Sequence, residues 1–311
     1  MTFTVTTGRM MVKTGHSAIR RVRFLPPGSS VGDIEVNTLG GIRDRGGPQE
    51  FLTPQRLDFD LLVHIESGFA RHTVDFTDHA LGAGDVLWVR AGQVHHWGAI
   101  ADIEGPVAMF GPHTVDERTR DLIRSHLIRP RSHWSAADLA GTPVSQALAL
   151  LVLSGNDPQA TERTGLRQVA LAHCLAALLV QLALVEPAGA APPPGPTHEA
   201  YTWFRDHIDE QFRSWHKVSQ YADRLGYSTR TLNRLARQHT GLSAKELIDE
   251  RVVLEAKRQL SHADASVSEI AEQLGFDDAS NFSSYFRRQT QLTPGTFRTQ
   301  SRSAGTDPRR A

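Results

Sequence analysis

The sequence contains a single cysteine, Cys174, among 311 residues. One cysteine cannot form an intramolecular disulfide or a zinc site with several cysteine ligands, and it fits a protein of the reducing cytoplasm. The chain also has no excess of charge of one sign, because 34 lysines and arginines match 34 aspartates and glutamates. This balance excludes a histone-like role, although it leaves room for a local basic face.

Long uninterrupted apolar runs are missing as well. The longest apolar stretch, Leu166 to Val185, is broken by Arg167, Gln168, His173 and Gln181. Each of these polar side chains would be costly in hydrocarbon, so we expect a helix of a soluble protein and no membrane partner. The basic residues near the N-terminus are followed by no apolar run, so no signal peptide is expected and the predicted location is the cytoplasm.

The length favours two domains, and a proline-rich segment, EPAGAAPPPGPT, marks the boundary between them. Prolines fix φ and remove backbone donors, so neither a helix nor a sheet can run through this segment. The predicted regions are a β-rich domain at 1–110, a helical connection at 111–185, the linker at 186–197, a helical domain at 198–300 and a disordered tail at 301–311.

The two halves differ in their local pattern. Short β-rich runs punctuated by glycine, such as LDFDLLVHIESG, FARHTVDF and GDVLWVRAG, indicate antiparallel strands of a barrel or sandwich. From about Pro143 the apolar residues recur at helical spacing. The fold class predicted is therefore α+β, with an antiparallel β-barrel first and an all-α domain last.

The last third contains an internal repeat. The segment VSQYADRLGYSTRTLNRLARQHTGLS is echoed by VSEIAEQLGFDDASNFSSYFRRQTQLT. In each copy a glycine, Gly226 or Gly275, permits the positive φ that ends a first helix and turns the chain sharply into a second. Such a helix-turn-helix leaves the outer face of its second helix, here called the reading helix, able to enter the major groove of DNA.

The charges agree with this interpretation on a local scale. The reading helices at 228–239 and 279–291 carry arginines and no acidic residue. The periodicity between the copies predicts one continuous helix over 243–260, about 27 Å long. A rod of that length can hold two reading helices about one turn of DNA, ~34 Å, apart.

These motifs, from Thr197 to Arg298, resemble the AraC/XylS family of bacterial transcription regulators. The resemblance implies a sequence-specific regulator, expected to be an activator, that binds double-stranded DNA through both helix-turn-helix units and contacts RNA polymerase when it activates. Two positions depart from the family pattern: Ala236, where a bulky aromatic is frequent, and Gln291, where glycine is frequent. Carried over to this sequence, base contacts fall to Arg230, Asn233, Arg234, Ser280, Asn281, Ser283 and Ser284, and phosphate contacts to Arg237, Arg287 and Arg288.

The segment GDVLWVRAGQVHHW resembles the second half of a cupin motif, and family members often carry a cupin-like effector domain. The alternative is a cupin-type metalloenzyme with an accessory helical domain. No His-x-His occurs in this half, and the adjacent His95 and His96 would face opposite sides of a strand, so neither a metal nor another cofactor is expected. No nucleophile–base motif supports an enzyme.

The remaining function of the barrel is to bind an unidentified small-molecule effector. The predicted lining residues are His64, Trp88, Arg90, His95 and Trp97, because aromatic walls with few polar groups are typical of such pockets. The alternative is that the two tryptophans simply fill the core. A stripe formed by Leu171, Leu175, Leu178 and Leu182 is either the seam of a homodimer or the face that packs on its own barrel.

Overall fold

The computed structural model describes residues 20–23, 34–47, 51–98, 100–127, 131–156, 164–185, 196–262 and 265–304. The chain divides into two compact units, one within Ile19–Ala190 and the other within Ala191–Gly305. Most of the predicted linker lies outside the described residues, and so does the end of the predicted tail. Residues 301–304 do not belong to a tail, because they complete the last helix, Pro294–Ala304.

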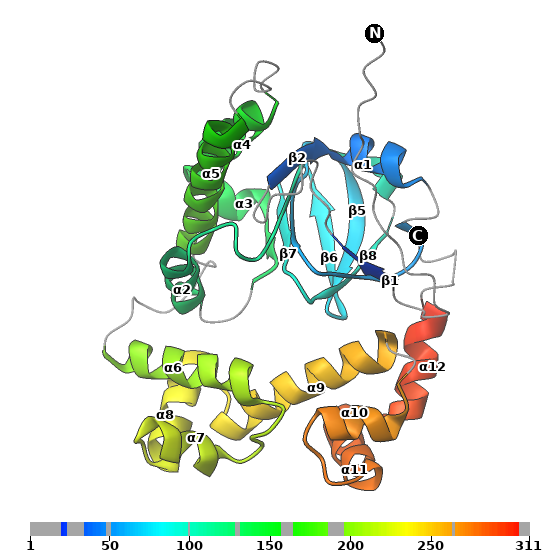
Figure 1. The fold of residues 1–311 in the computed structure, drawn as a ribbon, viewed down its shortest axis with the longest axis vertical. Coiled ribbons are helices and arrows are strands. Elements are labelled where there is room, and N and C mark those ends of the chain that lie inside the picture. Colours follow the sequence, from blue (N-terminus) through cyan, green and yellow to red (C-terminus); the bar gives the residue numbers. More distant parts are fainter. Residues whose placement is uncertain are drawn as a thin grey trace. The chain divides into compact units, whose positions relative to one another are not determined.

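The first unit is built on two β-sheets (Figure 1). One sheet has the order β1-β3-β8-β5-β6 with β9 paired to β5, and the other has the order β11-β7-β4-β10-β2. All pairs are antiparallel except β1 with β3. The strands are β1 (Arg20–Val22), β2 (Ile34–Thr38), β3 (Gln55–Leu57), β4 (Asp60–His64), β5 (Ser67–Val74), β6 (Thr77–Gly82), β7 (Val86–Val89), β8 (Val94–Trp97), β9 (Ile103–Glu104), β10 (Pro106–Phe110) and β11 (His133–Trp134).

Strand alternation divides the apolar residues of this unit between two cores. Leu61, Val63, Leu87 and Val89 lie in the core between the sheets, together with Trp97. The residues that alternate with them along β4 and β7 face the other way. They pack against helices in a second core, on the outer face of the five-stranded sheet.

The helices of the first unit are α1 (Leu39–Gly46), α2 (Glu117–His126), α3 (Ala136–Leu139), α4 (Val144–Gly155) and α5 (Thr164–Leu184). Segment 111–185 is therefore more than a connection, since it supplies a strand and most of the second core to the first unit. This agrees with the helical periodicity predicted from Pro143 onward.

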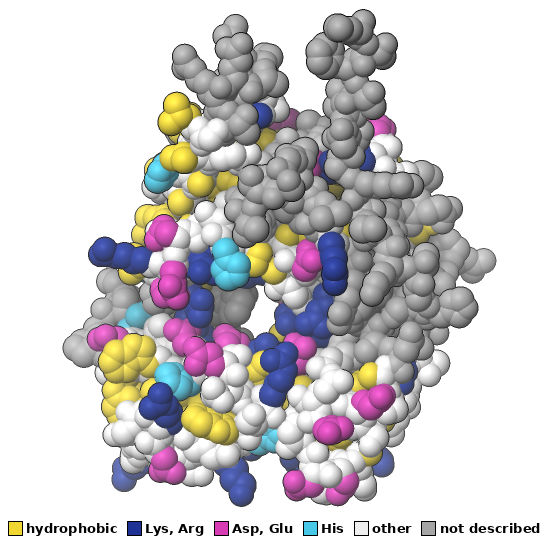
Figure 2. Space-filling model, viewed as in Figure 1, with side chains coloured by type: hydrophobic (Ala, Val, Ile, Leu, Met, Phe, Trp, Pro, Cys, Tyr) yellow, Lys and Arg dark blue, Asp and Glu magenta, His cyan; other side chains and the backbone are white. Residues whose placement is uncertain are grey.

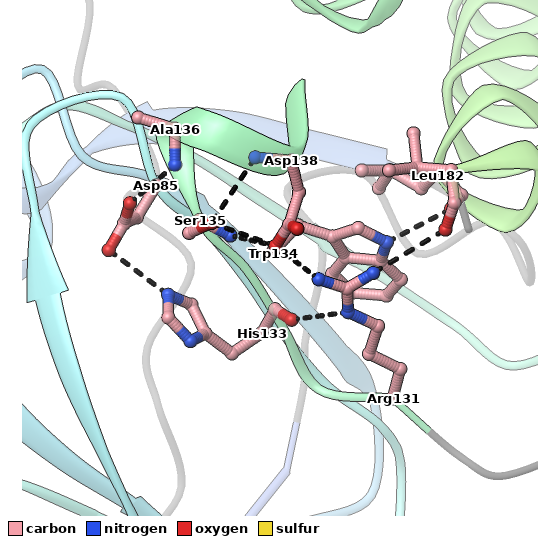
Figure 3. Close-up of polar contacts among 9 residues, drawn as sticks. Asp85, Arg131, His133, Trp134, Ser135, Ala136, Asp138 and Leu182 are labelled. Atoms are coloured by element: carbon pink, nitrogen blue, oxygen red, sulfur yellow. Dashed lines mark hydrogen bonds and ion pairs between the residues drawn. The ribbon is translucent and has the colours of Figure 1, made fainter. Parts of the chain in front are cut away.

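Polar contacts join β11 and these helices to the sheet (Figure 3). The Asp85 carboxylate accepts a hydrogen bond from the Ala136 N–H (2.8 Å) and lies 3.0 Å from Nε2 of His133. The Trp134 indole donates to the carbonyl of Leu182 (3.0 Å), and Arg131 pairs with Asp138 at the start of α3. Because each buried polar group here has a partner, the end of α5 is fixed to the five-stranded sheet.

The described residues of the second unit form these helices and no strand: α6 (Pro196–Gln211), α7 (Val218–Leu225), α8 (Thr229–Thr240), α9 (Ala244–His262), α10 (Val267–Gln273), α11 (Ala279–Thr290) and α12 (Pro294–Ala304). The predicted rod is confirmed as α9, which continues two residues beyond Leu260. It connects α7–α8 with α10–α11 (Figure 1). Together the two units confirm the predicted α+β class.

Candidate functional site

The first reading helix, α8, begins and packs as the repeat predicts. Gly226 ends α7 in the left-handed region (φ 70°), and Ser228 caps α8 by accepting a hydrogen bond from the Thr231 N–H (3.0 Å). Leu232 and Leu235 are buried on its inner face, and so is Ala236, the small residue of the first departure from the family pattern. The outer face of α8 is therefore exposed to solvent.

The arginines predicted for DNA lie on that exposed face. Arg230, Arg234 and Arg237 are all exposed, and one guanidinium nitrogen of Arg234 donates to the side chain of Gln238 (3.0 Å). Asn233 differs from them, because it is half-buried and bonded within the chain. The structure therefore places the three arginines on one exposed face of α8, and Asn233 is not part of that exposed group.

The second reading helix, α11, is capped by Asp278, whose carboxylate accepts hydrogen bonds from the backbone and side-chain N–H groups of Asn281 (2.7 and 2.8 Å). Phe282, Tyr285 and Phe286 are buried beneath the helix. Ser283 is half-buried and donates its hydroxyl to the Ala279 carbonyl. The other predicted contacts are exposed: Ser280, Asn281, Ser284, Arg287 and Arg288.

Gln291 ends α11 in the left-handed region (φ 62°), as Gly241 ends α8 (φ 77°). The second departure from the family pattern therefore leaves the turn intact. It places a side chain where glycine carries no steric cost.

The exposed faces of both reading helices are basic. Neither α8 nor α11 contains an acidic residue, so their cations lack neutralising neighbours on the same helix. In the space-filling view, lysine and arginine side chains reach the lower edge below the helix-turn-helix units, with acidic side chains among them around α10 and α11 (Figure 2). A surface of this kind can neutralise phosphates on a nucleic acid backbone.

The five residues predicted to line one effector pocket are not brought together. His64 pairs across the sheet with Val86, and both Val86 and Trp88 lie in the core beneath the helices. Trp97 instead lies between the sheets. The prediction of a single lining was wrong in this respect, because alternation along the strands sends His64, Trp88 and Arg90 outward and His95 and Trp97 inward. His64 and His95 also cannot share a metal ion.

The interior residues form a histidine pair that sequence reasoning did not assign. Nε2 of His72 lies 3.1 Å from Nδ1 of His95, and the indole of Trp97 stands edge-on to His72. Burial lowers the pKa of His95 to about 3 and holds the pKa of His72 well below its usual range. Both rings are therefore neutral at physiological pH. Their outer nitrogens, Nδ1 of His72 and Nε2 of His95, have no hydrogen-bond partner among the described residues.

The outward residues form a different cluster. The Arg90 guanidinium lies 4.0 Å from the centre of the Trp88 ring, and the Trp88 indole donates to Asp60 (2.8 Å). Burial raises the pKa of Asp60 to about 6 and lowers that of Arg90 to about 10. Within the described chain, both terminal nitrogens of Arg90 are buried without a hydrogen-bond partner.

The leucine stripe predicted as a dimer seam is buried within one chain. Leu171, Leu175, Leu178 and Leu182 are at most 2% exposed and belong to the core beneath the five-stranded sheet. The seam prediction is wrong, and the alternative that the helix packs on its own barrel is confirmed. By length and composition, Gly165–Leu184 could cross a membrane, but this is the same core helix.

Two helix-turn-helix units on a connecting helix, each with an exposed basic face, define a DNA-binding protein. Residues 221–300 match the family model described as "Helix-turn-helix domain". HTH-type transcriptional activators RhaS of Citrobacter koseri and Salmonella arizonae are each 26% identical over 289 residues, which cover 91% of this chain and 97% of the relative. The chain is thus a DNA-binding transcription regulator with a helix-turn-helix domain, and it is similar to these activators along most of its length.

Solved structures similar to this chain include ToxT from Vibrio cholerae, with a TM-score of 0.41 and 12% identity over 78% of this chain and 90% of that one. A regulator from Chromobacterium violaceum with an AraC-type DNA-binding domain has a TM-score of 0.31 and 22% identity, over 36% of this chain and 96% of that one.

Proposed function

We propose that the protein is a cytoplasmic transcription activator that reads DNA with α8 and α11 and responds to a small effector bound by its first unit. Its relatives are activators, which supports a productive contact with RNA polymerase. The observation that carries the proposal is the exposure of three arginines on α8 and two on α11, each opposite a buried apolar face. No catalytic activity is proposed.

Selection of the full chain against a pool of randomised duplexes tests the DNA-binding part. The expected result is enrichment of two conserved half-sites, with affinity that falls steeply as salt rises, because bound arginines release counterions from phosphates. Retention of all duplexes alike would contradict sequence-specific reading.

For the effector, we propose the His72–His95 pair as the polar contact. A neutral histidine pair joined by one hydrogen bond keeps one ring N–H donor and one ring acceptor outside that bond, whichever tautomer is present. A buried donor and acceptor without partners are costly, and a ligand that carries a separate acceptor and donor group could satisfy them. Trp97 would supply an apolar wall beside them.

Thermal unfolding against a panel of metabolites tests the effector proposal. A true effector at 100 times its Kd adds about 2.7 kcal/mol to stability. The His95→Leu variant should lose this gain, whereas replacement of the exposed His113 by Leu should keep it. An equal gain in both variants would place the effector elsewhere, with the Arg90 cluster as the next site to vary.

A homodimer remains our proposal, but on a different face of α5. Residues on the side opposite the buried stripe are exposed and apolar, among them Leu166 (71%) and Val169 (53%). On the neighbouring helix α4, Leu150 (54%) and Leu153 (71%) are exposed too. Contiguous exposed apolar side chains are typical of an interface with another chain.

Replacing Leu153 and Leu166 together by Asp should shift the full chain from dimer to monomer in sedimentation, because each dimer would bury four unpaired carboxylates. The matched control is Leu122→Asp on α2, at a leucine with 60% exposure outside this face. A monomeric wild type, or a double variant that stays dimeric, would refute this interface.

A further inference from the structure

The connecting helix α9 touches both reading helices of the chain. Its first turn contacts α8, and its middle contacts α11. Each contact is made by a polar side chain, the half-buried Asn233 in the first case and the buried Asp249 in the second. Neither residue is one of the arginines on the basic faces.

The first contact is made by Asn233 of α8. Its side-chain oxygen accepts a hydrogen bond from the Ala244 N–H (3.1 Å), a first-turn donor of α9, and its amide nitrogen donates to the Thr229 carbonyl (3.0 Å). First-turn N–H groups have no partner inside their own helix. The side-chain oxygen and nitrogen of Asn233 are thus both bonded within the protein. A bidentate contact with adenine would need both of these atoms.

The second repeat provides an internal comparison. With the offset of 50 residues that aligns Leu232 with Phe282, Asn233 corresponds to Ser283 and Ala244 corresponds to Pro294. Proline has no N–H to donate. In the second repeat, proline thus replaces the residue that donates the N–H, and serine replaces the asparagine that accepts it. Ser283 bonds to its own helix instead. This pairing of residue types indicates that Asn233 serves the start of α9.

The second contact is made by Asp249 of α9, which is 7% exposed. One carboxylate oxygen accepts a hydrogen bond from the Tyr285 hydroxyl (2.7 Å), the other accepts from the Gln289 amide (3.0 Å), and Lys245 forms an ion pair with the group. Both hydrogen-bond donors belong to α11. A buried carboxylate satisfied in this way ties its partners to one geometry, because a loss of alignment with α11 leaves it only the contact with Lys245 of its own helix.

We propose that Asn233 and Asp249 are positioning residues, which hold α8 and α11 at a fixed separation along α9 and so set the distance between the two half-sites that one chain reads. The inference rests on the proposed DNA-binding function. When two binding elements are held rigidly at the correct span, the second one binds at a high effective concentration. Loosening either contact lowers that concentration while each reading helix keeps its own outer face.

The test compares duplexes chosen by selection with the wild-type chain: one with both half-sites, one with only the half-site of α8, and a series with the spacing changed by one or two base pairs. The variant Tyr285→Phe/Gln289→Ala removes both hydrogen bonds that α11 donates to Asp249. Its affinity for the two-site duplex should fall at least about tenfold. Its affinity for the single half-site should stay the same, and its preference among spacings should flatten.

The matched control is Tyr227→Phe, which removes one tyrosine hydroxyl in the first repeat, since no hydrogen bond of the Tyr227 hydroxyl is found in the described chain. This variant should bind every duplex as the wild type does. A second variant, Asn233→Ala, should lose two-site affinity in the same way and keep the base preference of the α8 half-site.

Three outcomes would overturn the inference. An equal loss on all duplexes would mean that the bonds to Asp249 only support folding, and no loss would mean that they do not set the separation. A changed base preference in Asn233→Ala would make Asn233 a base-reading residue. In each case the wild type still selects its two half-sites, whereas a wild type that selects no sequence refutes the proposed function as well.

Discussion

Replacing Arg234 by Ala should cost about 1–3 kcal/mol of binding free energy on the selected duplex and relax base preference at one or two adjacent positions. Arg234 is exposed in the middle of α8, where a reading helix meets base edges, and its guanidinium can form a paired contact with guanine. Among the described residues its hydrogen-bond partner is Gln238, an exposed neighbour that it can release at small cost. Affinity for the wild-type site and for single-base variants of that site measures the effect.

Arg287→Ala provides the contrast. Arg287 lies in the last turn of α11, and we expect it to contact phosphate. Its loss should weaken all sequences alike and reduce the slope of log affinity against log salt by about 0.9. Arg118→Ala on α2 is the control, and it should change neither the affinity for DNA nor the slope of log affinity against log salt. If Arg234→Ala also weakened every sequence alike, Arg234 would be a phosphate contact and the base-reading assignment on α8 would be wrong.

Lowering the pH from 7 to 5 should reduce the free energy of unfolding of the first unit by about 2–3 kcal/mol. His72 and His95 have pKa values far below their usual range because burial opposes protonation. Between pH 6.5 and 5 the unfolded chain therefore binds two protons that the folded chain does not. The free energy of unfolding consequently decreases as the pH is lowered. Asp60 acts in the opposite sense. Its pKa is raised to about 6, so the folded chain gains a proton there and recovers about 1 kcal/mol.

Urea unfolding at the two pH values, followed by hydrogen exchange of peptides from β5 and β8, measures this loss in the first unit alone. The variant His72→Leu/His95→Leu should lose most of the dependence, because the lowered pKa values that remain, those of His64, His79 and His96, are opposed by the raised pKa of Asp60. His113→Leu, at an exposed position, should behave as the wild type does. A wild-type stability that is equal at pH 7 and pH 5 would show that the buried pair accepts protons in the folded state.

The second unit could be predicted well because its signals are local. The repeat, the turn glycines and the apolar spacing each specify structure within a few residues, and α9 was predicted to within two residues of its observed end. The role of Asn233 was missed, although the sequence held a signal for it: its counterpart in the other repeat changes together with the alanine-to-proline change at the start of the next helix.

The first unit could be predicted only in outline. A stripe of leucines has the same spacing whether it meets a second chain or its own sheet, so α5 alone could not decide between the two. In the same way, the sequence of a strand indicates which side chains share a face of the sheet, but it does not indicate which of the two faces packs against helices. Trp88 and Trp97 therefore lie in different cores, and His72 joins His95 through a strand pairing that no short motif encodes.

Hydroxyl-radical footprinting of the full chain on its selected duplex tests the central claim most directly. If α8 and α11 of one chain read the same duplex, one protomer should protect two stretches whose centres are about 10 base pairs apart on one face of the helix. Protection of a single stretch per protomer, or of two stretches on opposite faces of the duplex, would contradict the account.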